Sequence, residues 1–336
     1  MQVAPRLACI RFVSATDGAM RAGVNGGAPT MKKHWITTIA LALVLLVPAL
    51  GGQAAEAYRP TGARPAERSL IFGVHPYSTP QDLFQAYEPI VRYVESKVPG
   101  LHLQVEASRD YRDFEAKLEA GHFDFALPNP YETLLSLDSG YRVIAKMTPD
   151  DDFRGLIVAR KDKGIHSPRD LAGKTMAFPS ATAVAGTMLP LLYLHGQGLD
   201  VTRHLTIRYV GSQFSSLLTA YSGDVAACGS TVRFWRVWSR NNPAKAAEME
   251  VLWRTESLPH NAVVARRDVP DALAGQVARA LAGLDKDPAV DQRQFTEDQG
   301  HFELATDATY QPMRDFLTRY DQAIGLPEAM KKAGAN

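Results

Sequence analysis

The sequence predicts an α/β fold of two lobes joined by two crossover strands. Strand and helix signals alternate from Leu70 onward, which is the pattern of α/β proteins. Two similar β-rich segments, 155–162 and 261–268, each close in two basic residues and an aspartate. About a hundred residues separate them, too far for a solenoid repeat. We therefore expect the chain to leave one lobe, build a second and return, although two valine-rich strands can also resemble each other by chance. The predicted lobes are 58–157 with 262–336, and 158–261.

The first lobe opens with a short apolar run at 70–74, which predicts a strand. A helix should follow, because Thr79 can cap it, Pro80 suits the first helical position and Asp82 sits where a capping-box acid belongs. The alternating segment 101–105 predicts the next strand, half-buried.

A buried strand at 123–127 runs straight into Asn-Pro-Tyr-Glu at 129–132, a compact helix start with Asn as the cap. The helix before this strand should begin after Ser108 or Asp110 and end at Gly121. Strand then helix, twice over, implies parallel strands whose carboxyl ends meet at one edge. Open α/β sheets bind their ligands at that edge.

The segment between the two similar strands repeats the alternation, and two helices should follow the return to the first lobe. The predicted strands are 174–178, 205–210 and 225–228. The predicted helices are 183–195 (interrupted by Pro190), 215–221, 271–284 and one near 313–324.

The segment 31–57 has the organisation of an export signal. A basic start precedes an apolar run of roughly fifteen residues at 36–50, and Ala-Glu-Ala at 55–57 offers a cleavage site. A membrane span would need about twenty apolar residues, whereas this run breaks early at Pro48. We expect cleavage near Ala57 and a mature chain that works in the periplasm.

Residues 1–30 fit no part of such a signal, because they are rich in Gly, Ala and Arg and have no apolar period. We interpret them as an upstream extension produced by a start codon placed too early. Met31 is then the true start, with Met20 as the less favoured alternative.

Charge and cysteine content exclude several classes of protein. The formal net charge is +1, which gives no bulk electrostatic reason to bind nucleic acid or an anionic membrane. Cys9 precedes the signal, so Cys228 stands alone in the mature chain and no internal disulfide can form. No cysteine lies at the cleavage site, which argues against a lipid anchor. We expect a soluble monomer with Cys228 buried in an apolar strand.

Familiar catalytic motifs are missing from the sequence. It contains no His-Glu-x-x-His, no Gly-x-Ser-x-Gly and no phosphate-binding P-loop. The aspartates at 150–152 lack the spacing of a calcium loop and predict a solvated turn. The basic aromatic stretch that carries Arg233, Trp235 and Trp238 predicts a docking face or a half-buried helix. We expect no enzyme, no cofactor and no bound metal.

Six motifs follow one another along the mature chain. They are Asp-Phe-Ala-x-x-Asn-Pro-Tyr at 124–131, Arg-Lys-Asp at 160–162, Ser-Pro-Arg-Asp-Leu-Ala-Gly-Lys at 167–174, Ala-Phe at 177–178 leading to Gly186 and Pro190, Gly-Asp-Val-Ala-Ala at 223–227 and Leu-Pro at 258–259. In this order they resemble the periplasmic substrate-binding proteins of phosphate, phosphite and phosphonate ABC transporters. The resemblance implies a type II periplasmic-binding-protein fold, a small anionic solute in the cleft between the lobes, and a membrane permease as partner.

An oxyanion that leaves water needs hydrogen-bond donors, which helix starts and hydroxyls supply. Three predicted helix starts should face the implied cleft, and the first of them follows Tyr77. Tyr77, Ser78 and Thr79 are candidates there, with simple helix capping equally open for the two hydroxyls. At the second start, after Pro128, the candidates are Asn129 and the next aromatic residue.

Tyr131 matches the aromatic residue that follows this turn in the family. We expect it to face the ligand, with core packing as the alternative. The third helix start follows Phe178.

The third start departs from the family. The hydroxyl-rich Ser-Thr-Ser of the family falls on Ala-Val-Ala, beginning at Ala183, and these side chains cannot donate. Backbone amides of this turn can donate, and Ser180 or Thr182 could come in from just upstream.

The remaining candidates also differ from the family. Gly-Ser-His of the family is matched by Ser212 and Gln213 after a glycine, so an amide replaces the imidazole. The acid that would meet an aminoalkyl group falls near Ser230. An ammonium-bearing phosphonate is therefore the least favoured ligand. Arg154 or His260, at the starts of the two crossover strands, could supply the missing charge, with strand-end and loop roles as alternatives.

We therefore expect a solute-binding protein of an ABC importer. The alternative is a ligand-binding module that presents the same kind of solute to a membrane sensor histidine kinase.

Overall fold

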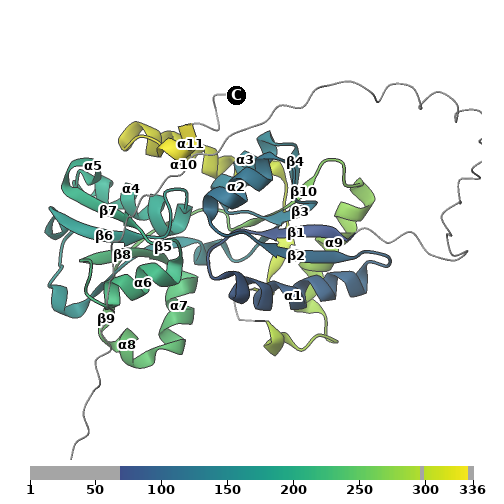
Figure 1. Ribbon diagram of the computed structural model, residues 1–336, viewed down its shortest axis with the longest axis horizontal. Helices are drawn as coiled ribbons and strands as arrows, with labels where there is room; N and C mark the ends of the chain where they lie inside the picture. Colours follow the sequence, from purple (N-terminus) through teal and green to yellow (C-terminus); the bar gives the residue numbers. More distant parts are fainter. Residues whose placement is uncertain (1–68, 296–298, 332–336) are drawn as a thin grey trace, which may run out of the picture. The chain divides into compact units, whose positions relative to one another are not determined.

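The computed structural model describes residues 69–295 and 299–331, which form two sheets flanked by helices (Figure 1). The export signal and the extension before it lie outside these residues, as does Cys9. Within the described ranges no helix is long and apolar enough to span a bilayer.

The first sheet has the strand order β11-β4-β10-β3-β1-β2 in the described part of the chain. Its strands are β1 (Leu70–Val74), β2 (Leu103–Ala107), β3 (Phe125–Leu127), β4 (Tyr141–Met147), β10 (Ala262–Arg266) and β11 (Phe302–Leu304). Strand β1 pairs in parallel with β2 and β3, whereas β10 runs antiparallel to β3 and β4. The predicted parallel strands are therefore present.

Helices cover both faces of this sheet. They are α1 (Pro80–Lys97), α2 (Tyr111–Glu119), α3 (Pro130–Asp138), α9 (Asp271–Gly283), α10 (Gln311–Ala323) and α11 (Glu328–Lys331). Adjacent strand residues face opposite layers: Phe125 packs with the side chains of α1 and α9, whereas Ala126 packs with those of α2 and α3. Burial on both faces explains why β3 reads as a continuous apolar run.

The second sheet has the order β7-β6-β8-β5-β9 in the same described residues. Its strands are β5 (Arg154–Arg160), β6 (Lys174–Phe178), β7 (Leu205–Tyr209), β8 (Ala227–Thr231) and β9 (Met249–Ser257). Its helices are α4 (Leu189–Gly196), α5 (Val201–His204), α6 (Gln213–Tyr221), α7 (Val232–Asn241) and α8 (Pro243–Ala247). Here too adjacent strand residues face opposite sides of the sheet, since Ile157 packs with α4 and Leu156 packs with α6 and α7. Cys228 is a buried free thiol in β8, as its apolar surroundings predicted.

The chain passes between the sheets at two places. It leaves the first sheet after Met147 and returns before Ala262. Strand β5 pairs along its length with β8 and β9, so residues 154–157, which we had assigned to the first lobe, pair in the second sheet. The two similar segments are thus not shared between the sheets. Each is the first strand after a crossing and runs antiparallel to its neighbours.

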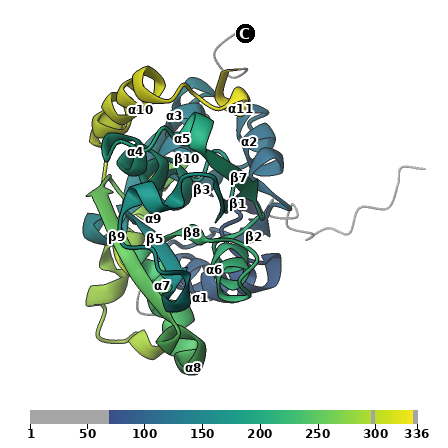
Figure 2. The same cartoon turned by 90° about the vertical axis from the view of Figure 1, so that its left-hand side faces the viewer.

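Helix α10 contacts helices of both sheets. It packs against α3 of the first sheet and α4 of the second (Figures 1 and 2). An ion pair of 2.9 Å joins Arg319 of α10 to Glu256 of β9. The chain therefore has a contact between the sheets in addition to its two crossings.

Candidate functional site

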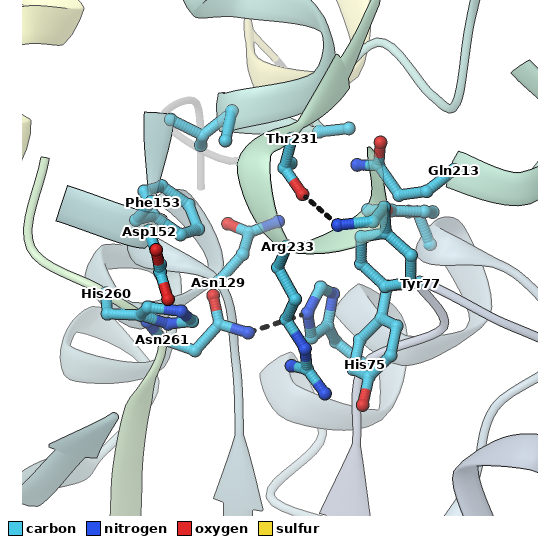
Figure 3. Close-up of a pocket in the computed structure, with 15 residues that line it drawn as sticks. His75, Tyr77, Asn129, Asp152, Phe153, Gln213, Thr231, Arg233, His260 and Asn261 are labelled. Atoms are coloured by element: carbon cyan, nitrogen blue, oxygen red, sulfur yellow. Dashed lines mark hydrogen bonds between the residues drawn. The ribbon is translucent and has the colours of Figure 1, made fainter. Parts of the chain in front are cut away.

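A small cavity lies where segments of both sheets meet (Figure 3). Its volume is about 30 Å³. The lining residues are His75, Tyr77, Tyr111, Asn129, Asp152, Phe153, Ala183, Val184, Ala185, Gln213, Thr231, Arg233, Phe234, His260 and Asn261. By the usual measure of about 10–15 Å³ per water, it is a space for two or three waters.

Four helix starts line this cavity. Asn129 caps α3 and Thr231 caps α7, while Gln213 is the first residue of α6. Ala183 precedes a π-helical turn, Val184–Met188, that continues into α4. The first N–H groups of a helix lack partners within it, and the N-terminus carries a partial positive charge. The local sequence rules that start these helices therefore also create an anion-binding environment.

Arg233 adds a full positive charge to this wall. Its side chain leaves α7, is only 6% exposed, and places the guanidinium carbon 5.3 Å from the centre of the Tyr77 ring. The same carbon lies 5.7 Å from the ring of Phe234. A guanidinium stays charged at any physiological pH. Arg233 therefore supplies a cation to the cavity.

The two imidazoles that line the cavity are neutral. Burial, with a contribution from the charge of Arg233, lowers the pKa of His75 to about 3. Burial and the same arginine also hold the pKa of His260 well below its ordinary value. His260 Nδ1 accepts a hydrogen bond of 2.7 Å from the backbone N–H of Asn261, so the ring proton is on Nε2. His260 therefore offers a donor rather than a charge.

Among the described lining residues, Asp152 is the only one with a carboxylate. Its two oxygens accept hydrogen bonds of 2.7 and 3.2 Å from Arg236 of α7. The other two aspartates of this turn are also engaged: Asp150 accepts from Lys146 and from the backbone of His260, and Asp151 pairs with Arg154. The predicted solvated turn is present, since Asp150–Asp152 has no buried residue and the side chain of Asp151 is 78% exposed, and its carboxylates also bond to neighbouring segments.

Two hydrogen bonds join the walls of the cavity. The side-chain amide of Asn129 donates to the carbonyl oxygen of Thr182 at 3.2 Å, and the backbone N–H of Gln213 donates to that of Tyr77 at 3.4 Å. In each pair one residue follows a strand of the first sheet and the other a strand of the second. These bonds close the cavity on two sides.

Five of the residues selected from the sequence line this cavity: Tyr77, Asn129, Ala183, Gln213 and His260. Other candidates lie outside it. Ser78 donates to Asp82 at 2.9 Å, and exposed Thr79 caps α1 by accepting from the backbone of the same aspartate. The helix-capping alternative therefore accounts for both.

Two further serines also lie outside the lining. Ser212 caps α6 by accepting from the backbone N–H of Ser215. Ser230 is fully buried within β8, next to the lining residue Thr231.

Tyr131, Ser180 and Thr182 line a different pocket, together with Tyr111 and Glu115. Tyr131 is 7% exposed and packs in the main core cluster, so the core-packing alternative describes its position. Burial raises the pKa of Glu115 in this second pocket to about 7.

Arg154 does not reach the cavity, because its guanidinium bonds to Asp151 and to the carbonyl oxygen of Thr255. Arg154 was one of two candidates for a charge at the ligand, but the arginine that lines the cavity is Arg233, which the sequence had placed in a docking or half-buried helix. A signal for it existed. Arg233 lies in the first turn of the helix that follows the carboxyl end of β8. Asn129 was selected because it lies at the equivalent point after β3.

The chain forms two sheets, each covered by helices, and passes between them twice. An enclosed cavity is lined by segments of both sheets. This arrangement is that of a type II periplasmic binding protein. The sequence profile of the ABC transporter phosphonate periplasmic substrate-binding proteins matches residues 72–315. The chain therefore belongs to this family of extracytoplasmic substrate-binding proteins.

Solved structures agree with the fold. PhnD1 from Prochlorococcus marinus (MIT 9301), in complex with methylphosphonate, has a TM-score of 0.69 at 16% identity, covering 76% of this chain and 99% of that one. A binding protein component of an ABC phosphonate transporter from Pseudomonas aeruginosa has a TM-score of 0.66 at 18% identity, covering 80% and 93%. At these identities the likeness concerns the fold.

A curated relative has a different role. The tetrathionate sensor histidine kinase TtrS of Salmonella typhimurium is 24% identical over 219 residues, which cover 58% of this chain and 36% of the kinase. The chain thus spans about a third of that relative.

Proposed function

We propose that this protein is the solute-binding component of an ABC importer and that it holds a small oxyanion in the cavity beside Arg233. The observation that carries the proposal is the combination of a buried guanidinium with four helix starts on one enclosed surface. Each of these groups favours negative charge. The only described carboxylate of the lining, Asp152, is paired with Arg236.

The size of the cavity supports a small solute. A volume of about 30 Å³, room for two or three waters, argues against a bulky solute, and even a five-atom oxyanion requires the walls to move slightly apart. A longer chain would have to separate Asn129 from Thr182, because their hydrogen bond closes one side.

The family supports delivery of the bound solute to a membrane permease. A second candidate function is favoured by the match to the tetrathionate sensor kinase: the chain would bind its solute and present it to a histidine kinase. The neighbouring genes discriminate the two, since an importer needs a permease and an ATPase, whereas a sensor needs a two-component pair.

The test of the site is a panel of solutes measured by thermal shift and calorimetry. It contains phosphate, phosphite, methylphosphonate, an aminoalkylphosphonate, sulfate and acetate, with a neutral amide as the control. A ligand that binds only the folded state raises the melting temperature by mass action. We expect at least one of the small oxyanions to raise it and the neutral amide to leave it unchanged. Binding of the amide but of no anion would contradict the proposal.

We further propose export to the periplasm through the segment 31–57, release of the bound solute unchanged, and action as a monomer. Amino-terminal sequencing of protein recovered from a periplasmic extract should begin near Tyr58. The solute recovered after incubation should have the same phosphorus NMR spectrum as before, and light scattering should give the mass of one chain.

A further inference from the structure

Two amide oxygens at the cavity are acceptors without a donor. Asn261 and Gln213 both line the cavity, and each is 4% exposed. Neither Oδ1 of Asn261 nor Oε1 of Gln213 has a hydrogen-bond partner among the described residues. A buried acceptor left unpaired costs about 1–3 kcal/mol of stability. Two such acceptors on one cavity therefore indicate that a bound solute donates hydrogen bonds to them.

The amide of Asn261 places its nitrogen, and not its oxygen, against His75. Its Nδ2 lies 3.0 Å from Nε2 of His75 (Figure 3). An amide nitrogen only donates, so Nε2 accepts and the ring proton of His75 is on Nδ1. The other end of the amide, Oδ1, therefore remains an acceptor.

The rest of the lining already serves the ionised oxygens of a ligand. Arg233 and the helix starts donate, whereas the hydroxyl of Thr231 is used to cap α7 and the oxygens of Asp152 bond to Arg236. A fully ionised oxyanion carries no hydrogen, so any of its oxygens placed against the amide oxygens would be repelled. A site with acceptors for a ligand hydroxyl discriminates strongly against an analogue that lacks it.

We propose that the site selects an oxyanion that keeps one acidic hydrogen. Its ionised oxygens would lie against Arg233 and the helix starts, and its hydroxyl would donate to Asn261 Oδ1 or Gln213 Oε1. Singly ionised phosphonic acids and doubly ionised phosphoric acid belong to this class, whereas sulfonates and phosphonate dianions do not. The inference rests on the proposed anion-binding function and specifies its substrate class.

Burial shifts the pKa values of three ionisable groups around the amides away from the neutral range. Burial keeps the pKa of His75 at about 3, holds that of His260 well below its ordinary value and raises that of Tyr111 well above its own. The other charged groups of the described lining are Arg233 and Asp152. Glu132, behind His75, is a buried acid with a pKa well above its ordinary value.

Glu115 has a pKa of about 7 and belongs to the neighbouring pocket that shares Tyr111 with the cavity. Any effect that it has on the electrostatics of the cavity would act on every singly charged ligand alike.

The experiment compares two isosteres by calorimetry on the intact protein at about pH 5 and about pH 9. Methanesulfonate is singly charged at both values and has no acidic hydrogen, whereas methylphosphonate loses its second proton between them, as other phosphoryl groups do near neutral pH. We expect methylphosphonate to bind at least tenfold more tightly than methanesulfonate at the lower pH. This preference should shrink by about tenfold per pH unit above the second pKa of the ligand, because only the protonated form binds. Dividing the two affinities removes protein titration, including that of Glu115.

Two variants assign the acceptors. Gln213→Met and Asn261→Leu keep the approximate shape of each side chain and remove its amide. We expect at least one of them to lower the preference for methylphosphonate at pH 5 by tenfold or more. Gln104→Met changes an exposed glutamine of β2 and should leave the preference unchanged. Melting curves check that each variant folds.

The possible outcomes separate the two claims. If both isosteres bind equally at both pH values, anion binding stands and the requirement for an acidic hydrogen is wrong. If neither binds and no other anion of the panel does, the proposed function fails and this inference fails with it. A preference for methylphosphonate that persists undiminished at pH 9 would also overturn the requirement, since the dianion would then bind.

Discussion

The side chain of Arg233 leaves a helix of the second sheet and lies over Tyr77, which follows a strand of the first. The pKa values of His75 and His260 are both lowered in part by its charge. These effects on two separate rings indicate a positive potential across the cavity.

Replacement of Arg233 tests this charge. Arg233→Gln should weaken binding of whichever anion scores in the panel by about 10- to 100-fold, because a charge-assisted hydrogen bond of roughly 1.5–3 kcal/mol is lost. The matched control is Arg208→Gln, which changes an exposed arginine of β7. Calorimetry should find the control unchanged. Equal affinities for all three proteins would remove Arg233 from the site.

Glycine 229 tests the packing between β8 and the π-helical turn. A Cβ atom at this position would meet the carbonyl oxygen of Gly186 and would lie 2.6 Å from the ring of Phe178. Gly229→Ala should therefore lower the free energy of unfolding by about 1–3 kcal/mol. Gly196→Ala is the control, since a Cβ there meets nothing within 4 Å. Chemical denaturation should separate the two, and a Gly229 variant as stable as the control would contradict this packing.

At the scale of single elements, the start of α3 follows its sequence closely. The side chain of Asn129 accepts from the backbone of Tyr131 and Glu132, and Glu132 accepts from the backbone of Asn129 at 2.8 Å, which completes a capping box. Cap, proline and acid were recognisable in the sequence because these contacts span only three residues. The start of α1 was equally recognisable, but the sequence did not show that Ser78 and Thr79 lie outside the cavity.

Thr79 distinguishes a capping role from a ligand contact. Thr79→Ala should lower the free energy of unfolding by about 0.5–2 kcal/mol, since the threonine caps α1, and should leave anion affinity unchanged. Asn129→Ala removes a cap, a lining residue and the bond to Thr182, so both quantities should fall. Denaturation and calorimetry on the two variants provide the comparison. A Thr79 variant with weakened binding would place that hydroxyl at the ligand.

At the scale of the whole molecule, buried ionisable groups around the cavity set the pH dependence of stability. Below pH 4.5 the unfolded chain binds more protons at His75 and His260 than the folded protein does, because both folded pKa values lie below 6.5. Stability should therefore fall as the pH drops toward about 3. Glu115 and Glu132 act in the opposite sense, since burial raises their pKa values above 4.5 and the folded state keeps their protons.

His75 and Glu115 should oppose each other between pH 4.5 and 6.5 and give a broad stability maximum there. Above that range the glutamates dominate, so stability should fall as the pH rises. The stability that protonated Glu115 contributes is lost by about pH 7. Each group contributes on the order of 1.4 kcal/mol per pH unit. Denaturant titrations at a series of pH values measure this curve. Glu115→Gln should be more stable than the wild type at about pH 8 and lose that advantage near pH 4.5; an advantage independent of pH would rule out this titration.

The sequence by itself determined the alternation of strands and helices, the starts of α1 and α3 and the presence of two lobes, because strand period, capping and turn chemistry act over a few residues. Five of the candidates that it selected, Tyr77, Asn129, Ala183, Gln213 and His260, line the cavity. Only the tertiary structure decided that Arg233 lines the cavity, that Tyr131 packs in a core and that the amide oxygen of Asn261 is left without a partner. Those outcomes depend on which segments of the two sheets meet across the cavity, and residues as distant in the chain as Tyr77 and Arg233 come together only through packing.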